Sequence, residues 1–335
     1  MACVITALLF TLVATPPQVH LVAVGDVMLG RGVAVHTARH GNPLQHLTPL
    51  LTKADVAFAN LECTLSNRGR RKEGGFALRA APVSSVFLSD AGLDVVSLAN
   101  NHTTDFGPHA LLDTADAVAA AGVLGVGLTG PDAPRFSVVM VRGVRVAFVA
   151  FNDIEPSATR RNRTGVAALN LQDATRAVEH ARHNADVVVV SLHWGYQYQH
   201  APTRHMRRVA HALSDAGAHL ILGHHPHVIQ GLERRGRTVI AYSLGNAVFD
   251  QRDPKTHRGL ALDVVLNRDG VVDVTLLPLD TRTPSPTLLT GRAARRALKD
   301  VKVWSRPLGN HVLLDERGAR VVVPPPPPVL VASQS

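Results

Sequence analysis

Cysteine and aromatic residues are scarce in this 335-residue sequence. Cys3 and Cys63 are its only cysteines, which excludes a disulfide framework and a metal site built from thiolates. Aromatic residues make up 4% of the chain, whereas 46% is hydrophobic, mainly alanine, valine and leucine. A chain of this length can form one large or two ordinary domains. The composition predicts a globular α/β protein with buried aliphatic strands.

The apolar stretch at the N-terminus, Ala2–Ala14, is too short to cross a membrane as a free helix. It resembles the hydrophobic region of a secretory signal, although it lacks a basic segment before it and a clear cleavage site after it. We therefore predict that residues 1–18 form a signal or an N-terminal extension. The protein is expected in the cell envelope or outside the cell, and a cytoplasmic protein that begins with a strand is the alternative.

Acidic residues are fewer than lysines and arginines, and the net charge of +9 at neutral pH reflects arginines spread along the chain. The sequence has no recognised nucleic-acid-binding module and no aromatic residues interleaved with basic ones, so nucleic acid is not an expected partner. An anionic polymer or a phosphoester substrate fits the charge better. Internal repeats and a P-loop are also missing.

Histidines are concentrated in the stretch Ala218–Gly231, where an apolar strand runs directly into His224, His225 and His227. In an extended segment His225 and His227 point to the same side, so both rings can reach one ion, and Pro226 stiffens the turn between them. A polar loop with unrelated histidines is the alternative interpretation. Polar side chains follow other predicted strands in the same way, which favours a metal site.

These polar side chains come after the strands of an alternating β/α pattern. They are Asp26 after strand 20–25, Glu62 after strand 56–59, Asn101 and His102 after strand 94–98, His193 after strand 186–192, and His225 and His227 after strand 220–222. The carboxyl ends of strands form one edge of an open α/β sheet, where ligands bind. Carboxylate, amide and imidazole donors without thiolates suit Mn²⁺, Fe²⁺ or Zn²⁺. Two such ions can hold the oxygens of a phosphoryl transfer.

Hydrophobic periodicity predicts the remaining elements. Helices are expected at residues 82–91, 108–121, 171–184 and 202–216, and strands at residues 122–127 and 239–244. Hairpins are expected where residues 137–141 pair with 145–151 and where residues 259–266 pair with 271–277.

Two loops and the C-terminal part of the chain carry basic residues. We interpret the loops 67–75 and 152–165 as solvent-exposed, with Arg160, Arg161 and Arg163 as candidates for holding an anion. Residues 282–335 are basic, weakly helical at 292–300 and proline-rich at 324–328, so we expect a C-terminal extension without chemistry.

Six motifs occur in order between residues 19 and 280. They are GDVMLGR (25–31), ANLE (59–62), SLANNHTTDFG (97–107), SLHWG (191–195), GAHLILGHHPHVIQGLE (217–233) and YSLGNAVFD (242–250). Together they resemble the capsule-biosynthesis CapA family, which is named for poly-γ-glutamate capsule synthesis. The resemblance implies an α/β fold, a four-layer αββα metallophosphatase-like sandwich over residues 19–281. It also implies a metal-dependent, phosphoesterase-like envelope hydrolase of polymer biosynthesis, with capsule synthesis and export proteins as partners.

The resemblance also implies roles for particular residues. Metal ligation carries over to Asp26, Glu62, Asn101, His193, His225 and His227, with one or two divalent ions as the cofactor. His102 is implied as the proton donor to the leaving group, and Asp105 as the residue that orients it. His224, Gln197 and Asn246 are expected around the ligands.

Two positions depart from the family pattern. Metallophosphatases usually carry Asp-x-His after the first strand, and Met28 stands at the histidine position here. One metal position is therefore a ligand short, so that either His224 compensates or the site holds a single ion. The family's tryptophan motif continues with a glutamate where this chain has Gln197. The alternative function is a non-catalytic assembly or export factor that holds an anionic polymer at the same metal site.

Overall fold

The computed structural model describes residues 17–130, 133–154, 164–309, 311–315 and 318–321. The apolar stretch at residues 2–14, the three arginines Arg160, Arg161 and Arg163, and the proline run at residues 324–328 lie outside these ranges. Within them, none of the helices combines the length and the hydrophobicity that a membrane-spanning helix needs.

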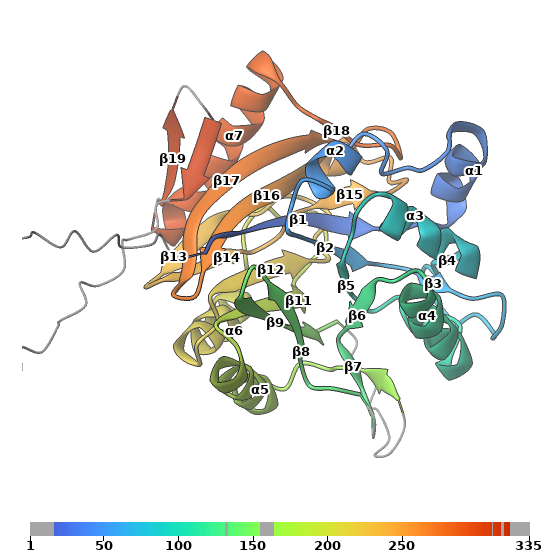
Figure 1. Cartoon of the computed structure of the whole chain (residues 1–335). Coiled ribbons are helices and arrows are strands. Elements are labelled where there is room, and N and C mark those ends of the chain that lie inside the picture. Colours follow the sequence, from blue (N-terminus) through green and yellow to red (C-terminus); the bar gives the residue numbers. More distant parts are fainter. Residues whose placement is uncertain (1–16, 131–132, 155–163, 310, 316–317, 322–335) are drawn as a thin grey trace, which may run out of the picture.

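Among the described residues, the larger of two main β-sheets contains ten strands (Figure 1). They are β1 (Val19–Val27), β2 (Val56–Leu61), β5 (Val95–Ser97), β6 (Leu124–Val126), β15 (Asn246–Val248), β16 (Arg258–Asn267), β17 (Gly270–Asp280), β18 (Thr287–Leu288), β19 (Val312–Asp315) and β20 (Gly318–Val321). The order is β19-β20-β17-β16-β1-β2-β5-β6, with β15 paired to β1 and β18 to β17. β1, β2, β5 and β6 run parallel, and β16 and β17 form an antiparallel hairpin beside them.

The smaller main sheet, in the part of the chain that the structure describes, contains six strands in the order β13-β14-β12-β11-β9-β8. They are β8 (Ser137–Val141), β9 (Val144–Asn152), β11 (Val187–His193), β12 (Leu220–His224), β13 (Leu232–Arg235) and β14 (Thr238–Ala241). β9, β11, β12 and β14 are parallel. Two short pairs complete the strands: β3 (Thr64–Leu65) with β4 (Arg79–Ala80), and β7 (Leu128–Thr129) with β10 (Gly165–Val166).

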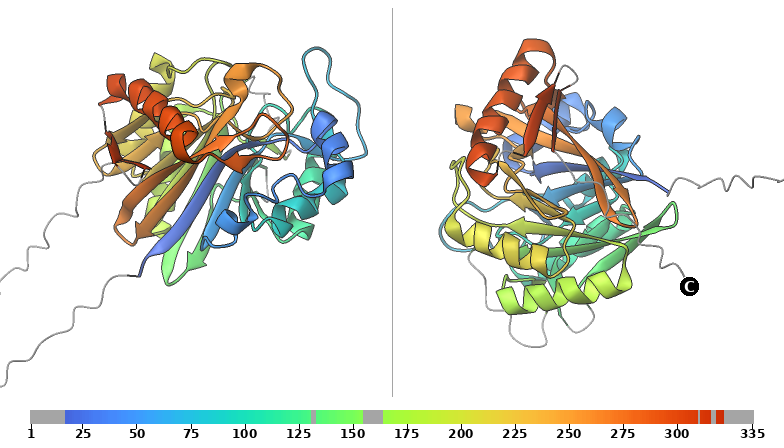
Figure 2. Two further views of the ribbon diagram at one scale, coloured as in Figure 1. Left: turned by 90° about the horizontal axis from the view of Figure 1, so that it is seen from above. Right: turned by 90° about the vertical axis from the view of Figure 1, so that its left-hand side faces the viewer.

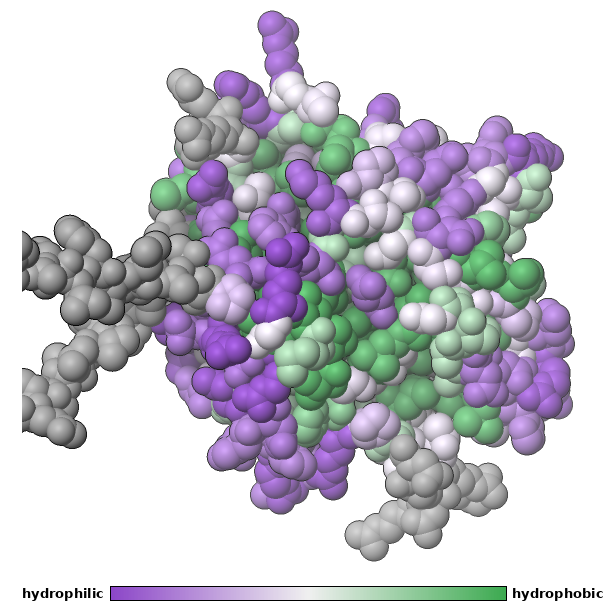
Figure 3. All heavy atoms as spheres, viewed as in Figure 1, coloured by the Kyte–Doolittle hydropathy of each residue, from purple (hydrophilic) through white to green (hydrophobic). Residues whose placement is uncertain are grey.

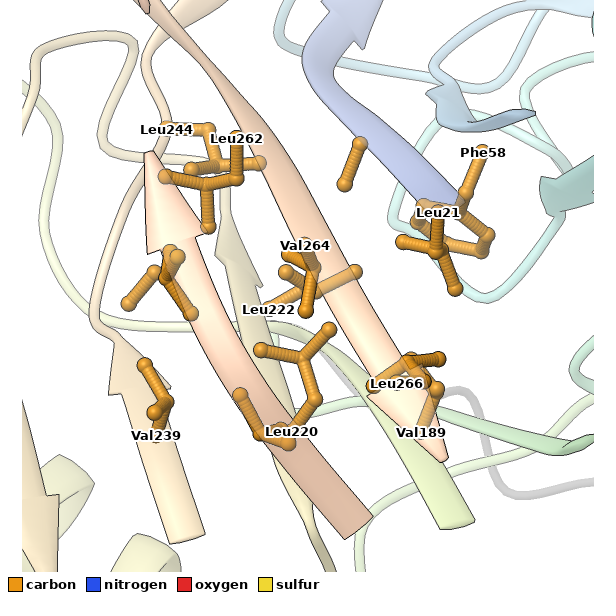
Figure 4. Close-up of a cluster of buried hydrophobic side chains, with 14 of the residues drawn as sticks. Leu21, Phe58, Val189, Leu220, Leu222, Val239, Leu244, Leu262, Val264 and Leu266 are labelled. Atoms are coloured by element: carbon orange, nitrogen blue, oxygen red, sulfur yellow. The ribbon is translucent and has the colours of Figure 1, made fainter. Parts of the chain in front are cut away.

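Alternating side chains along the strands build a core on each face of both sheets. In β1, Leu21 belongs to the core between the two sheets, and its neighbour Val22 belongs to the core on the outer face. In β11, Val189 belongs to the core between the sheets and Val188 to the core on the outer face of the smaller sheet. Because successive side chains of a strand point to opposite faces, continuous apolar runs indicate strands that are buried on both sides. Figure 4 shows part of the inner core, to which strands of both sheets contribute.

Helices cover the two outer faces. α5 (Leu171–Asn184) and α6 (Arg204–Asp215) lie side by side over the smaller sheet, as Figure 2 shows, and bury Val178 and Val209. α1 (Arg31–His40), α2 (Thr48–Leu51), α3 (Val86–Asp90) and α4 (Pro108–Ala120) cover the larger sheet with η1 (Pro82–Ser85), a 3₁₀ turn. Val33 and Val118 belong to the core on that side. The predicted four-layer αββα arrangement is confirmed.

Most of the predicted elements are present with small shifts at their ends. The helix expected at residues 171–184 is α5, and both predicted hairpins occur, as β8 with β9 and β16 with β17. The helix expected at residues 82–91 is divided into η1 and α3. A proline begins η1. Proline is favoured in the first turn of a helix because an N–H group at that position has no partner within the helix, so its absence loses no hydrogen bond.

The chain beyond residue 282 continues the larger sheet. β18 pairs with β17, and β20 pairs with β17 on one side and β19 on the other. α7 (Gly291–Ser305) packs on these strands, and its Leu298 and Val301 belong to the core between the sheets. Two further 3₁₀ turns are η2 (Pro254–Thr256) and η3 (Arg306–Leu308). The described part of the predicted C-terminal extension therefore packs as one body with the sheet.

The surface in the view of Figure 1 is mixed in polarity. Figure 3 shows hydrophilic residues along the rim of this face and hydrophobic ones nearer its middle. The large apolar side chains that are exposed lie scattered along the chain, for example Phe76, Met140 and Val303. Single exposed apolar residues are ordinary on protein surfaces, so they do not by themselves indicate a binding site.

Candidate metal centre

The register between neighbouring strands brings the polar strand ends together. In the larger sheet, Asp26 of β1 lies beside Asn60 of β2 on one side and Asn246 of β15 on the other. In the smaller sheet, His193 and His224, the last residues of β11 and β12, are register partners. The two sheets meet here, because His224 Nδ1 lies 3.1 Å from Asp26 Oδ1. The strand ends converge as predicted, but between two sheets and not along the edge of one.

Two triads of buried side chains have the geometry of a metal site, and they share Glu62. In the first triad, Glu62, His193 and His225 each offer one ligand atom, and these atoms lie within 4.8 Å of one another. The second triad joins Asp26, Glu62 and His227 under the same limit. Glu62 Oε1 lies 3.9 Å from His193 Nε2 and 3.6 Å from His227 Nε2. A shared carboxylate of this kind can bridge two ions or bind one.

Several ligand atoms at this centre have no hydrogen-bond partner among the described residues. They are both carboxylate oxygens of Glu62, Nδ1 of His225 and Nε2 of His224. The Glu62 side chain is fully buried, and an uncompensated buried carboxylate costs on the order of several kcal/mol. A divalent cation would satisfy these atoms, so the residues present fit a metal.

Burial keeps the histidines of the first triad neutral, which is the form that binds a metal. Burial, together with the nearby His227, lowers the pKa of His225 to about 3. Burial and the adjacent His225 also hold the pKa of His193 well below its ordinary value. Cys63 lies close in sequence to the centre, but burial raises the pKa of its thiol to about 12, so it offers no thiolate.

The two carboxylates of the centre differ in their protonation. Burial and the neighbouring Asp26 carboxylate raise the pKa of Glu62 well above its ordinary value. Burial acts against the charge of Asp26 as well, but hydrogen bonds from His224 and His227 outweigh it and hold the pKa of Asp26 well below normal. Without a cation, Asp26 therefore favours its ionised form, whereas Glu62 favours its protonated form.

His102 lies against the same carboxylate and is held by Asp105. His102 Nε2 is 3.8 Å from Glu62 Oε1, and His102 Nδ1 is 2.7 Å from Asp105 Oδ2. That Asp105 oxygen also accepts the backbone N–H of Leu78 at 2.7 Å. Asp105 therefore binds one ring nitrogen of His102 while the other, Nε2, faces the centre, and their roles in catalysis stay predictions.

Lys72, which was not among the predicted site residues, binds the other oxygen of Asp105. Its Nζ lies 2.7 Å from Asp105 Oδ1 and donates to the Asn101 carbonyl at 3.2 Å. The side chain is 29% exposed, whereas Arg70 and Glu73 in the same loop are at least 90% exposed. The loop 67–75 is thus solvent-exposed at its tip, but Lys72 turns inward. A single lysine in a basic loop gives no sequence signal for this contact.

Two asparagines outside the predicted ligand set connect the strand ends. Asn60 Nδ2 donates to Asp26 Oδ1 at 2.9 Å and lies 3.3 Å from His193 Nδ1. Asn100 Nδ2 donates to Asn60 Oδ1 at 3.1 Å, and Asn100 Oδ1 accepts the backbone N–H of His102. Their positions in the sequence could have indicated them. Asn100 directly precedes the predicted ligand Asn101, and Asn60 lies two residues before Glu62 at a strand end.

The structure brings the other predicted residues to the centre in supporting contacts. Asn101 Oδ1 lies 2.8 Å from His193 Nε2, the same nitrogen that faces Glu62, so metal ligation by Asn101 stays a prediction. Asn246 Oδ1 lies 2.9 Å from His227 Nδ1, which directs the opposite ring nitrogen to Glu62. His224 contacts Asp26 through Nδ1. Second contacts of this kind orient metal ligands and tune their basicity.

Gln197 and Met28 are not part of this network. Gln197 is exposed, and no hydrogen bond or ion pair joins it to the centre in the described part of the chain. Met28 is fully buried in the core between the larger sheet and its helices, where its Sδ accepts the backbone N–H of Gly30 at 3.0 Å. The position that usually carries a histidine therefore serves packing in this chain.

The histidine turn has a different backbone from the extended segment that we predicted. β12 ends at His224, and His225 and His227 have φ angles of 93° and 57°. Tyr198, with φ of 62°, donates its N–H to the Pro226 carbonyl at 2.9 Å. Non-glycine residues with positive φ are uncommon and concentrate at functional sites. The two rings converge because the backbone turns sharply, not because they alternate along a strand.

The two packed sheets with polar strand ends form a four-layer αββα sandwich of the metallophosphatase-like class. A phosphatase of Mycoplasma pneumoniae superposes with a TM-score of 0.52 at 13% identity, over 80% of this chain and 96% of that chain. The 5'-nucleotidase precursor of Thermus thermophilus gives a TM-score of 0.50 at 16% identity, over 87% of this chain and 59% of that chain. At these identities the likeness shows the fold alone.

Residues 20–251 match the family model described as bacterial capsule synthesis protein PGA_cap, and the chain belongs to this family. The PGA biosynthesis protein CapA of Bacillus subtilis (strain 168) is 33% identical over 274 residues, which are 78% of this chain and 72% of that protein. The capsule biosynthesis protein CapA of Bacillus anthracis is 32% identical over 305 residues, 84% of this chain and 74% of that protein. The resemblance carried by the six motifs is confirmed.

Proposed function

We propose that this protein is a metal-dependent, phosphoesterase-like hydrolase in the biosynthesis of an anionic capsule polymer of the poly-γ-glutamate type. The observation that carries the proposal is the pair of buried triads sharing Glu62, with His102 beside them. Membership of the PGA_cap family supports the proposed type of polymer, and so do the names of the relatives, which refer to PGA and capsule biosynthesis.

Oxygen and nitrogen ligands without sulfur suit Mn²⁺, Fe²⁺ or Zn²⁺. When bound, one or two such ions would supply Lewis acidity to a phosphoryl oxygen and to an attacking water. Glu62, His193 and His225 would hold one ion, and Asp26, Glu62 and His227 a second.

His102 would protonate the leaving oxygen. With Nδ1–H donating to Asp105, the proton that is transferred would be the second proton of the ring, carried on Nε2 on the side that faces Glu62. Lys72 Nζ pairs with the other oxygen of Asp105 at 2.7 Å and so helps to hold that carboxylate in place beside the ring.

The cell envelope is the proposed compartment, with capsule synthesis and export proteins as partners. Residues 1–18 would act as a signal or extension, residues 19–281 as the metallophosphatase domain and residues 282–335 as its C-terminal extension. The names of the relatives support the setting, because they are described as capsule and PGA biosynthesis proteins.

A second candidate is a non-catalytic assembly or export factor that holds an anionic polymer at the same centre. Met28 favours it, because this buried thioether occupies the position at which metallophosphatases carry a histidine ligand. A metal-binding scaffold needs fewer ligands than a two-ion enzyme.

Metal analysis followed by turnover of p-nitrophenyl phosphate with Mn²⁺ separates the two candidates. Under the proposed function, the wild type binds metal and hydrolyses the ester. His102→Ala would keep the metal and lose turnover, while Gln197→Ala, at an exposed position, would keep both. Bound metal without turnover of any phosphoester, in the wild type itself, would support the assembly factor instead.

A further inference from the structure

Two adjoining cavities on the surface share His257 and Arg282 and lie next to the metal centre. The first has a volume of about 500 Å³ and is lined by Phe249, Gln251 and Arg252, among others. The second has a volume of about 530 Å³ and extends to α7. We call the two together the arginine groove.

The near end of the arginine groove contacts residues that support the centre. The Phe249 ring packs edge-on against His227, with ring centroids 4.8 Å apart. Gln251 Oε1 accepts from Asn246 Nδ2 at 2.9 Å, and Asn246 in turn binds His227. The groove therefore begins one side chain away from the second triad.

The far end of the groove is formed by α7. Arg292 and Arg296 both line the second cavity and are exposed. Residues four apart on a helix are neighbours on one face, so these two guanidinium groups form a pair of adjacent sites. Arg258, whose Nη1 lies 2.7 Å from Asp300 Oδ2, ties the helix to β16.

The charge of the arginine groove is not balanced within it. Asp250 pairs with Arg31, and Asp280 accepts from Arg282 Nε at 2.9 Å. For Arg252, Arg292 and Arg296, no ion pair is found with a carboxylate among residues that the structure describes. The groove therefore presents three uncompensated guanidinium groups along a path that leads from the metal centre to α7.

We propose that the arginine groove binds an extended polymer with repeated carboxylates and guides it to the metal centre. This inference rests on the proposed function, because the metal centre would act on the bound polymer, although binding itself needs no catalysis. Guanidinium groups form paired hydrogen bonds with carboxylates, and several in a row favour a repeating anion over a single one. Phe249 is the only phenylalanine, tyrosine or tryptophan among the described lining residues, so the groove lacks the stacking platforms of single-stranded nucleic acid binding.

The test compares two double variants of the full chain that change the net charge equally on the same helix. Arg292→Glu with Arg296→Glu reverses charge in the groove, whereas Arg295→Glu with Lys299→Glu reverses it at residues that line a different cavity. All four positions are exposed, so both variants should fold. Fluorescence anisotropy measures binding of labelled poly-γ-glutamate, inorganic polyphosphate and single-stranded DNA at equal charge concentration.

The groove variant is expected to bind poly-γ-glutamate about tenfold more weakly at low salt than the control variant, with the difference shrinking as salt rises. Hydrolysis of p-nitrophenyl phosphate should be the same in both, because this small ester does not reach α7. Equal weakening in both variants, or in neither, would overturn the proposal. Tighter wild-type binding of polyphosphate or DNA would overturn the choice of ligand. Since anisotropy requires no turnover, a failure of the proposed enzymatic function would be seen separately.

Discussion

Glu62 is the residue on which the metal centre depends most. It belongs to both triads, it is fully buried, and neither of its oxygens finds a hydrogen-bond donor among the described residues. Burial and the Asp26 carboxylate raise its pKa, so without a cation the ionised form is unfavourable. These properties describe a ligand whose natural partner is a cation.

Replacing Glu62 by glutamine should therefore remove both ions together. The amide is close in size to the carboxyl group, so the fold is kept while the bridging charge is lost. His225→Ala should remove only the ion of the first triad, and His227→Ala only that of the second. Elemental analysis of the purified variants measures the metal content. Retention of the wild-type content in Glu62→Gln would show that the ligands lie elsewhere.

Asp105 offers a test of catalysis that leaves the ligands untouched. Asp105→Asn keeps the size of the side chain but loses the carboxylate that accepts the Nδ1–H of His102, and with it the ion pair with Lys72. We expect kcat for p-nitrophenyl phosphate to fall by about tenfold to a hundredfold with the metal content unchanged. Gln197→Ala is the matched control. A loss of metal together with activity would mean that Asp105 maintains the fold of the centre and not the proton transfer.

Among the secondary-structure elements, the strands were easier to predict than their ends. The apolar runs at residues 186–192 and 220–222 predict buried strands, and β11 and β12 follow them closely. The turn after β12 was harder, because positive φ at His225 and His227 is set by contacts such as that of Tyr198 with Pro226, which are distant in sequence. Local periodicity contains no information about such contacts.

His219, just before β12, makes the stability of the smaller sheet sensitive to pH. Its Nδ1 accepts the backbone N–H of Val188 in β11 at 3.0 Å, and burial, with Arg182 and Arg237 nearby, lowers its pKa from 6.5 to about 4. Between these two values the unfolded chain binds a proton that the folded chain does not. The free energy of unfolding therefore rises with pH across this window and falls as the solution is acidified from pH 6.5 to pH 4.

The prediction compares the wild type with His219→Asn, whose amide oxygen can accept the same N–H group without titrating. Urea unfolding should show that the advantage of the wild type shrinks by about 3 kcal/mol as the pH falls from 6.5 to 4. A pH-independent difference between the two proteins would show that the imidazole is accessible to protons in the folded state.

At the scale of the whole molecule, the sequence predicts the layers but not how the sheets meet. Alternating β/α elements and doubly buried strands predict an α/β domain, and the family resemblance implies the four-layer αββα sandwich. The convergence of Asp26, Glu62 and the histidines follows from their places at strand ends. The assignment of strands to two sheets depends on long-range pairing, such as that of β1 with β15, which no local pattern encodes. For the same reason the sequence does not indicate Lys72, because its role depends on Asp105 and Asn101, which are distant in sequence.

The packing of the C-terminal segment predicts that α7 and its strands unfold together with the rest of the sandwich. Leu298 of α7 lies in the core between the sheets, so Leu298→Ala should lower the free energy of unfolding by roughly 2 to 4 kcal/mol in a single cooperative transition. Leu288→Ala, at a side chain 39% exposed, should change it little. A separate early transition in urea for the Leu298 variant would mean that α7 and its strands fold independently of the sandwich.

We propose that the ends of both sheets together hold a divalent cation at Glu62. Crystals grown with Mn²⁺ and measured at its absorption edge test this claim directly. We predict anomalous density beside Glu62, between it and the side chains of His225, His227 or both. Anomalous density only at other sites, or none in crystals from manganese-saturated protein, would contradict the claim.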